Sequence, residues 1–279
     1  MIIWLASYPK SGNTLLRGIL ATYFFSKDGN FDFNHLYKIG QFPSYKHFHD
    51  LKIDISDDNQ IYSNLIKAQQ LINNNNKQLK FFKTHSALVK INNNNFTDLN
   101  NTLGAVYVVR DPRNVVSSFA HHYQVDIDEA TKCLVNEKFW NYKNEKLPKT
   151  FLSSWSSNYN SWKQLNEKKL IIKYEDLIEN KRRVLLKVFK FFETLGAKIN
   201  LDMVKLNKII KSTEFDRMKD LENKQDFQES MIDKKTGKKR AFFNLGPKND
   251  WKKILDNKNT DIIEKNFEKE MKELGYLRS

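Results

Sequence analysis

Hydrophobic and polar positions along the chain form two kinds of block. Short apolar runs, several of them rich in β-branched residues, have the length of buried strands. We expect strands at residues 2–7, 79–85, 103–110 and 170–174. Elsewhere apolar residues recur at the spacing of one helix face. We expect helices at residues 15–24, 61–72, 113–123, 151–165, 181–195, 201–210, 215–221 and 261–274.

The order of these blocks indicates the fold. Strands that alternate with helices are typical of a parallel sheet with helices on both faces. We therefore predict an α/β fold with a central parallel β-sheet flanked by helices. In such sheets a ligand binds beyond the carboxyl ends of the strands. The pattern shows no repeat and no long linker, so we expect one domain over residues 1–279, with residues 225–249 as a mobile loop.

Composition narrows the class of protein. Of the 279 residues, 40% are hydrophobic and 13% are aromatic, which is typical of a globular chain. No apolar run approaches the length of about 18 residues that a membrane span needs, and no basic segment precedes the short first run. We therefore expect no membrane span and no signal peptide. The lone Cys133 argues against a disulfide framework, so we expect a reducing, cytoplasmic location.

The net charge of +14 has two interpretations. A lysine-rich surface keeps a protein in solution, and a basic surface also attracts nucleotides, nucleic acids or acidic glycans. Lysine and asparagine are abundant along the whole chain, including the asparagine runs at residues 73–76 and 92–95. This general bias makes the charge weak support for nucleic-acid binding, and we expect no nucleic acid as a partner.

A tight polar loop joins the first predicted strand to the first predicted helix. The loop consists of Pro9, Lys10, Ser11, Gly12, Asn13 and Thr14, and Leu15 begins the apolar face of the helix. Backbone N–H groups at such a loop and helix start converge on one point, which favours an anion, and Lys10 adds a positive charge. We therefore predict a P-loop-like nucleotide-binding architecture. The common order, in which the lysine follows the last glycine, is absent here.

Basic residues also follow the next two predicted strands. Lys83 and His85 lie at the end of the second strand, and Arg110 ends the third. Because the carboxyl ends of parallel strands share one edge, we expect these side chains near the phosphate-binding loop. An imidazole titrates near neutrality and suits a general base. Arg110 offers a guanidinium fork for a phosphate, or would pair with Asp111 or Asp176 in a purely structural role.

Together these segments resemble the PAPS-dependent sulfotransferases, where PAPS is 3′-phosphoadenosine 5′-phosphosulfate. The loop at residues 8–14 is similar to the family's 5′-phosphosulfate loop, Tyr-Pro-Lys-Ser-Gly-Thr-Thr, with one change at Asn13. The family's 3′-phosphate element is matched by Arg110, Pro112 and Ser118. Counterparts also exist for Lys83-Thr84-His85 and for Tyr174-Glu175-Asp176, so the resemblance spans most of the chain.

The resemblance implies a role for each matched residue. His85 would be the general base, Lys10 would stabilise the leaving group, and Lys83 would hold the sulfuryl group. The residues implied at the 5′-phosphosulfate are Lys10, Ser11, Gly12, Asn13, Thr14 and Leu15. Those implied at the 3′-phosphate are Arg110 and Ser118, with Ser117 as the alternative to Ser118, and those on the adenine side are Tyr174, Thr213 and Phe215. We expect no metal, because a sulfuryl group carries less charge than a phosphoryl group.

One segment near the C-terminus departs from the family's pattern. The family has an Arg-Lys pair on the 3′-phosphate, directly before a glycine and a later Gly-Asp-Trp. Here Gly246, Asp250 and Trp251 match, but Asn244 and Leu245 replace the basic pair. We count Gly246 among the cofactor-binding residues and expect a weaker grip on the 3′-phosphate unless another cation of this loop compensates. The candidates are Lys238, Lys239, Arg240 and Lys248.

The resemblance therefore predicts sulfuryl transfer from PAPS, the co-substrate, to a hydroxyl or amine of a small-molecule or glycan acceptor. We expect the acceptor pocket within residues 28–58, 126–148 and 225–249. Its aromatic residues would suit an apolar ring, and its lysines an acidic sugar. The aromatic candidates are Phe42, Tyr45, Phe48, Phe139, Trp140 and Tyr142.

Two other functions stay open on the same fold. The first is a P-loop-type kinase, which needs a lysine after the glycine and an acidic ligand for Mg²⁺. The second is a non-catalytic protein that binds an anion or a nucleic acid. The sequence carries no decisive signal for an oligomeric state.

Overall fold

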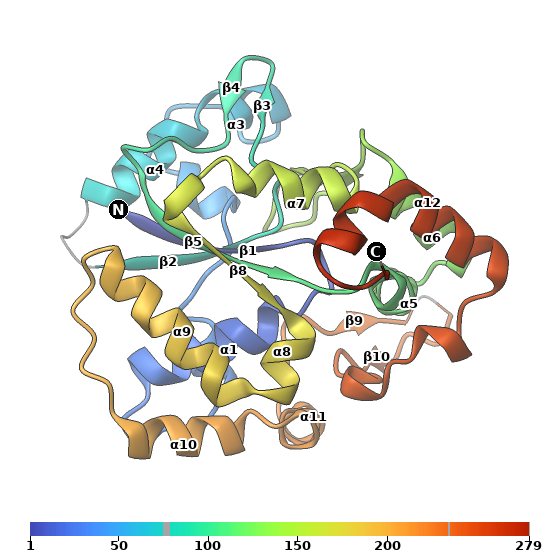
Figure 1. Cartoon of the computed structure of the whole chain (residues 1–279). Coiled ribbons are helices and arrows are strands. Elements are labelled where there is room, and N and C mark those ends of the chain that lie inside the picture. The colour runs from blue at the N-terminus through green and yellow to red at the C-terminus, as the bar shows by residue number, and fades with distance from the viewer. Residues whose placement is uncertain (75–78, 234, 279) are drawn as a thin grey trace.

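A central parallel sheet organises the computed structural model, which describes residues 1–74, 79–233 and 235–278 (Figure 1). Among these residues, four strands pair in the order β2-β1-β5-β8, and every pairing is parallel. The strands are β1 (Ile2–Ser7), β2 (Lys80–Thr84), β5 (Thr102–Val109) and β8 (Lys169–Lys173). The predicted α/β fold with a central parallel sheet is therefore confirmed.

The remaining strands are two-residue segments that form three small antiparallel hairpins in the described part of the chain. The pairs are β3 (Lys90–Ile91) with β4 (Asn94–Asn95), β6 (Trp140–Asn141) with β7 (Thr150–Phe151), and β9 (Met231–Ile232) with β10 (Lys239–Arg240).

Helices fill the segments between the strands. The α-helices are α1 (Asn13–Phe25), α2 (Phe33–Leu36), α3 (Asp58–Ser63), α4 (Leu65–Asn74), α5 (Pro112–Tyr123), α6 (Ile127–Val135), α7 (Trp155–Lys163), α8 (Tyr174–Glu179), α9 (Lys181–Thr194), α10 (Met203–Ser212), α11 (Phe215–Lys224) and α12 (Asn257–Glu273). Short 3₁₀ helices lie at Tyr45–Phe48, Asn166–Lys168, Gly246–Lys248 and Trp251–Lys253.

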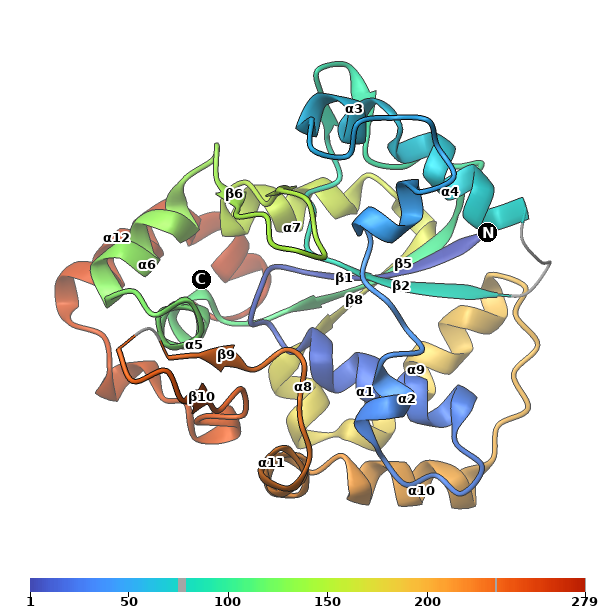
Figure 2. The same cartoon turned by 180° about the vertical axis from the view of Figure 1, so that it is seen from behind.

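The helices cover both faces of the sheet. Figures 1 and 2 show α1, α8, α9 and α10 on one side of the strands and α3, α4 and α7 on the other. Every residue of β1 is buried, as expected for the central strand of a parallel sheet. Its side chains alternate between two cores, because Ile3 and Leu5 pack towards α1 and α9, whereas Trp4 packs with Phe42 and Phe96 on the opposite face. The helices thus fix the strands, and the strands fix the loops at their carboxyl ends.

Several segments differ from the sequence-based prediction. Helices α2 and α8 were not predicted, and the helix expected at residues 61–72 is divided between α3 and α4. The helix expected at residues 151–165 begins only at Trp155, because Phe151 pairs in β7 and the Ser154 side chain caps the helix by accepting from the Ser157 N–H. Helix α6 was not predicted, although Asp126 caps it and its Ala130 is fully buried. The expected loop at 225–249 contains the β9–β10 hairpin and buried phenylalanines, so a loop alone is an incomplete description.

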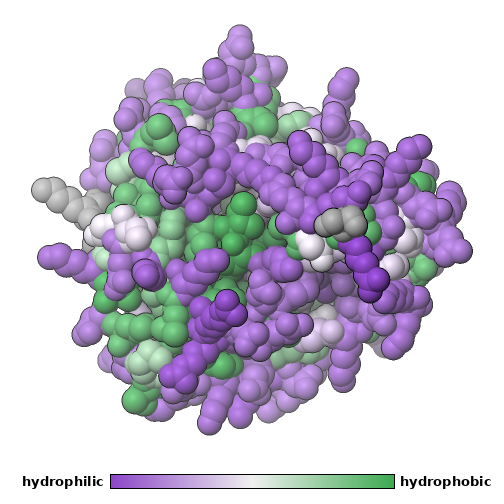
Figure 3. Space-filling model, in the orientation of Figure 1, coloured by the Kyte–Doolittle hydropathy of each residue, from purple (hydrophilic) through white to green (hydrophobic). Residues whose placement is uncertain are grey.

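The face of the molecule in Figure 3 is mostly hydrophilic, as the net charge of +14 leads one to expect. Figure 3 shows a hydrophobic area near the centre of one face, where β8 forms the sheet edge between α7 and α9. Among the described helices, none has both the length and the apolar character needed to span a bilayer. The cytoplasmic location stays a prediction.

Candidate functional site

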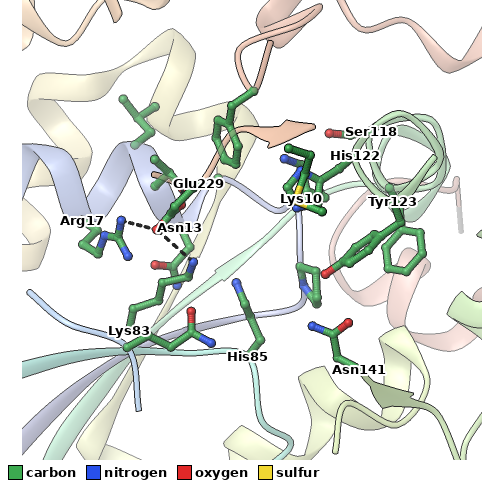
Figure 4. A pocket seen from close by; sticks show the side chains of 18 of the residues that line it. Lys10, Asn13, Arg17, Lys83, His85, Ser118, His122, Tyr123, Asn141 and Glu229 are labelled. Carbon is green, nitrogen blue, oxygen red and sulfur yellow. Dashed lines mark hydrogen bonds and ion pairs between the residues drawn. The ribbon is translucent and has the colours of Figure 1, made fainter. Parts of the chain in front are cut away.

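The loops that follow the four strands of the sheet line one large cavity. Its volume is about 1390 Å³, and its walls include Lys10 after β1, His85 after β2, Arg110 after β5 and Tyr174 after β8. The register of the strands explains this convergence, since Ala6 pairs with both Thr84 and Tyr107 and the strands are parallel. Figure 4 shows His85 between Lys83 on one side and Lys10 on the other. The sequence therefore identified residues that share one cavity.

The loop after β1 has the backbone that an anion site at a helix start requires. Gly12 precedes α1 with φ 99°, and a Cβ there would lie 2.3 Å from Cδ2 of Tyr174. Only glycine meets both conditions without strain. The Asn13 side chain fixes the loop to β1 by donating to the Leu5 carbonyl at 2.8 Å. The backbone N–H groups at the start of α1 are thereby held in position.

The predicted loop residues differ in what their side chains do. Thr14 and Leu15 line the cavity with Lys10, Gly12 and Asn13. Ser11 is fully buried and does not line it, and its hydroxyl has no hydrogen-bond partner among the described residues. Any contact of Ser11 or Asn13 with a ligand must therefore come mainly from the backbone, since the Asn13 amide is engaged with β1.

The surroundings of Lys10 lower the pKa of its ammonium group. The residue has φ 66°, and its Nζ lies 3.7 Å from the centre of the Phe242 ring. Burial lowers the pKa of Lys10 from 10.5 to about 7, the charge of Glu229 offsets part of this, and Lys83 and Arg110 lower it further. A lysine whose pKa lies near neutrality takes up protons when an anion binds beside it, because the anion favours the charged form.

His85 has a hydrogen-bonding pattern that fixes its tautomer. Its Nδ1 lies 2.8 Å from the Ser7 carbonyl oxygen, which can only accept, so Nδ1 carries the proton. In the neutral ring, Nε2 is then the nitrogen with the free lone pair. Burial and the charge of Lys83 lower the pKa of His85 to about 3, although the hydrogen bond to Ser7 opposes this. The ring is neutral at physiological pH and can accept a proton on Nε2.

Arg110 has no carboxylate partner among the described residues. Its Nη1 donates to the Lys10 carbonyl at 3.2 Å, and its guanidinium stacks 4.4 Å from the centre of the Tyr174 ring. Its buried Nε has no partner in the described chain. Asp111, one candidate for a structural pair, instead binds Arg113 at 2.7 Å. The geometry therefore favours the interpretation of Arg110 as a ligand for an anion.

The neighbouring serines divide their roles. Ser118 lines the cavity from α5, and Figure 4 shows its side chain at the cavity wall. The Ser117 hydroxyl is engaged, since it donates to the Asn114 carbonyl and to the side chain of Asn249, the latter at 2.9 Å. This arrangement favours Ser118 over Ser117 as the partner of Arg110.

The predicted adenine-side residues all line the cavity. Phe215 lies against Gly246, where a Cβ would come within 2.1 Å of the ring at a φ of 54°. Thr213 also lines the cavity, but its hydroxyl donates to the Ile209 carbonyl at 2.7 Å and completes the end of α10. Tyr174 and Phe215 therefore offer ring surfaces here, whereas Thr213 contributes mainly to the shape of the wall.

The C-terminal loop does not supply the cations that were expected to compensate for Asn244 and Leu245. Both of these residues line the cavity, whereas none of the four candidate cations does. Two of them are engaged elsewhere, because Lys239 pairs with Asp226 at 3.1 Å and Arg240 with Asp233 at 3.4 Å. A cation that sequence reasoning missed, Lys181 of α9, lines the cavity near Thr213. No motif marks it, because it sits inside an ordinary amphipathic helix.

An ion cluster beside Lys83 was also missed. The Glu229 carboxylate binds Arg17 of α1 at 2.5 Å and Lys83 at 3.4 Å, and it accepts from the Thr14 hydroxyl at 3.2 Å (Figure 4). Burial would raise the pKa of Glu229, but the charges of Arg17 and Lys83 outweigh it and hold the pKa well below its usual range. Arg17 was detectable in principle, because it lies three residues after Thr14 on the same helix face.

The three segments expected around the acceptor all contribute to the cavity wall. Tyr45, Phe139 and Tyr142 line it, together with aliphatic residues such as Ile39 and Ile55. Three other aromatic candidates do not. Phe42 and Phe48 are fully buried in the core beneath, and Trp140 packs edge-on against Phe151 and Tyr62. Their apolar character serves packing, which the sequence pattern alone cannot distinguish from a pocket wall.

No group of three or more histidine, cysteine, aspartate or glutamate side chains within the described ranges could hold a metal ion. The expectation of a metal-free reaction stays a prediction.

Comparisons with known proteins agree with this geometry. The curated relatives include Sulfotransferase 2A1 of Macaca fascicularis, 27% identical over 61% of this chain and 56% of that protein. Amine sulfotransferase of Oryctolagus cuniculus is 26% identical over 62% of this chain and 56% of its own length. The matched segments thus span little more than half of these relatives.

Solved structures show the same fold over almost the whole chain. Mouse sulfotransferase SULT7A1, complexed with PAP, has a TM-score of 0.63 at 19% identity, covering 98% of this chain and 85% of that one. Retinol dehydratase in complex with androsterone and inactive cofactor PAP has a TM-score of 0.64 at 17% identity, covering 97% and 80%. The family model described as "Sulfotransferase domain" matches residues 2–275. This chain therefore belongs to the sulfotransferase domain family.

Proposed function

We propose that this protein transfers a sulfuryl group from PAPS to a hydroxyl or amine of a small-molecule acceptor. The observation that carries the proposal is the single cavity in which Lys10, His85 and Arg110 meet at three neighbouring strand ends. Family membership supports it, as do the fold neighbours that were crystallised with PAP, the product that PAPS leaves after transfer.

The residues present suit the two anionic ends of PAPS. The start of α1 and Lys10 offer backbone donors and a cation for the phosphosulfate end. Arg110, whose buried Nε has no partner among the described residues, offers charge-assisted hydrogen bonds for the 3′-phosphate, and Ser118 offers a hydroxyl. Tyr174 and Phe215 line the same cavity and present ring surfaces for the adenine.

In the proposed reaction His85 is the general base. The acceptor oxygen or nitrogen attacks sulfur, the bond between sulfur and the bridging oxygen breaks, and PAP leaves. The acceptor proton passes to Nε2, the ring nitrogen that the Ser7 carbonyl leaves free. The negative charge of the bound donor beside His85 raises the pKa of the ring from its value of about 3 towards a useful range.

Two lysines would balance the charge that develops. Lys10 would face the bridging oxygen, where negative charge grows as the bond breaks, and Lys83 would hold the sulfuryl oxygens. Lys83 is buried and lies two residues before His85, so both side chains project from the end of β2.

The acceptor end of the cavity favours a small molecule with a ring. Tyr45, Phe139, Tyr142 and Ile55 supply apolar wall there. Retinol dehydratase was crystallised with androsterone and with retinol, which are ring-bearing alcohols. A polar glycan would bury hydroxyl groups against this apolar wall without hydrogen-bond partners, which is unfavourable.

Calorimetric titration with PAP, ADP and ATP with Mg²⁺ tests the donor. We expect PAP to bind at least about tenfold more tightly than ADP, because ADP lacks the 3′-phosphate that Arg110 would hold. Equal or tighter binding of ATP would contradict the proposal and favour a kinase.

An acceptor screen read by an added sulfate mass tests the reaction. His85→Gln should lose turnover by about 10²–10⁴-fold and still bind PAP, since general acid–base catalysis contributes that much. A variant that keeps full turnover would exclude His85 as the base. His35→Gln, at a histidine of α2 that does not line the cavity, is the matched control and should keep its activity.

A further inference from the structure

A carboxylate of the protein itself occupies an anion site inside the cavity. Glu229 is bound by the Arg17 guanidinium, the Lys83 ammonium and the Thr14 hydroxyl. The Arg17 and Lys83 side chains are only 3% and 9% exposed. The site is therefore built from buried donors, not from flexible surface residues.

These donors overlap with those that sulfuryl transfer needs. Thr14 belongs to the loop proposed for the phosphosulfate end, and Lys83 is the residue proposed to hold the sulfuryl oxygens. Arg17 lies one helical turn beyond Thr14 and faces the same point of the cavity. The Glu229 oxygens thus contact two residues that the proposed function assigns to the sulfate end of the donor.

The charges of Arg17 and Lys83 favour the replacement of the Glu229 carboxylate by another anion. Removing Glu229 without a replacement would leave two buried cations unpaired, which is strongly unfavourable. A sulfuryl group brings several oxygen acceptors and negative charge to the same donors. The Nε of Arg17 is buried and has no hydrogen-bond partner among the described residues, so Glu229 does not use all the donors of this guanidinium.

We propose that Arg17 binds the sulfuryl group of the donor together with Lys83 and Thr14, and that the Glu229 carboxylate occupies this subsite until the donor enters. The inference rests on the proposed function and adds to it a third side chain that contacts the transferred group. It also makes Glu229 an internal competitor of PAPS, but not of PAP, which lacks the sulfuryl group.

The backbone beside Glu229 is anchored, so the exchange needs only a side-chain rotation. Phe227 is 1% exposed and stacks on Phe33. The Gln228 N–H donates to the Tyr37 hydroxyl at 3.0 Å, and the Ser230 hydroxyl donates to Glu222. The Glu229 side chain can turn from the donors into the open part of the cavity while these anchors hold.

The test compares the dissociation constants of PAP and PAPS by calorimetry without acceptor. In Glu229→Gln, the ratio of the PAP constant to the PAPS constant should rise about tenfold, because PAPS no longer displaces a charged competitor. In Arg17→Met within the Glu229→Gln background, that ratio should fall by about tenfold or more, since the sulfuryl group loses a charge-assisted contact. Arg17→Lys in the same background should recover part of it.

Asp226→Asn is the matched control, because it removes one negative charge from the same segment at an exposed residue that pairs with Lys239. It should leave the ratio unchanged. Thermal unfolding of each variant without nucleotide confirms that it is folded.

Two results would overturn the inference. The first is an equal change in PAP and PAPS affinity in Glu229→Gln, which would indicate a general charge effect. The second is weaker PAPS binding in that variant, which would make Glu229 a fixed partner that positions Arg17 and Lys83. Failure of the proposed function looks different, because then neither nucleotide binds the unmodified protein.

Discussion

Nucleotide binding should be coupled to a proton through Lys10. In the free protein, burial places the pKa of Lys10 at about 7, so half of the side chains are neutral near neutral pH. A phosphate beside the ammonium would favour the charged form and return the pKa towards its ordinary value of about 10.4. Binding at a pH above 7 must therefore take up a proton.

The size of the effect follows from these two pKa values. At about pH 8 the free side chain is about 90% neutral, so PAP binding takes up about 0.9 proton, against about 0.1 at pH 6. Since the pKa is lower in the free protein than in the complex, affinity falls as the pH rises above the free value. The loss approaches tenfold per pH unit, or about 1.4 kcal/mol, until the pKa of the complex is reached.

Calorimetry in buffers with different ionisation enthalpies measures the proton uptake directly. The phosphates of PAP also titrate, and Lys10→Met serves to subtract their contribution, because the nucleotide is the same in both titrations. We expect the difference between the two proteins to be about 0.9 proton at pH 8 and near zero at pH 6. Lys10→Arg should bind PAP at both pH values without this uptake, since a guanidinium stays protonated. Equal uptake by the unmodified protein and by Lys10→Met at pH 8 would refute the reasoning.

Three further predictions concern other residues around the cavity. Gly12→Ala places a Cβ 2.3 Å from Tyr174 at a φ of 99° and should cost about 1–3 kcal/mol of unfolding free energy in urea denaturation. Gly237→Ala, with φ 67° but nothing within 4 Å of the added Cβ, should cost less, and an equal cost would exclude the Tyr174 contact as the cause. Arg110→Lys keeps the charge but loses the guanidinium fork, so PAP should bind about tenfold or more weakly by calorimetry, and unchanged affinity would remove Arg110 from the 3′-phosphate site. Glu222 accepts from the N–H groups of Phe242 and Phe243, so Glu222→Gln should speed hydrogen exchange at these two amides, and unchanged protection would contradict that anchoring role.

The parts that the sequence predicted correctly are those with a local pattern. The four main strands are short apolar runs with a polar residue at the end, and a parallel sheet brings such ends to one edge. Lys10, His85 and Arg110 were found in this way, and the cavity contains all of them. Their individual roles stay proposals, but their common location follows from topology alone. The single domain over residues 1–279 also stays a prediction.

The parts that the sequence did not predict depend on contacts between distant segments. Glu229 lies 212 residues after Arg17, and its charge has a partner only because the segment after α11 returns to the start of α1. Lys181 reaches the cavity because α9 begins with this residue, and its Nζ donates to the Thr213 carbonyl. Phe42 and Phe48 were predicted in the acceptor pocket, but both are fully buried in the core. A linear pattern contains no information on any of these pairings.

Arg110 gives the proposed donor site a structural basis that does not require a basic pair at residues 244 and 245. A guanidinium has five N–H donors. Arg110 donates one hydrogen bond to the Lys10 carbonyl at 3.2 Å and one to the Gly246 carbonyl at 3.5 Å. Those two bonds link the loop after β1 and the C-terminal loop to the end of β5, so both halves of the donor site are positioned by one side chain. Within the described part of the chain, no carboxylate binds this guanidinium and its Nε has no partner, so in the proposed complex the remaining donors can serve a phosphate. Because stacking on Tyr174 fixes the plane of the guanidinium, this fork is oriented before any nucleotide binds, and less entropy is lost than two flexible surface cations would lose.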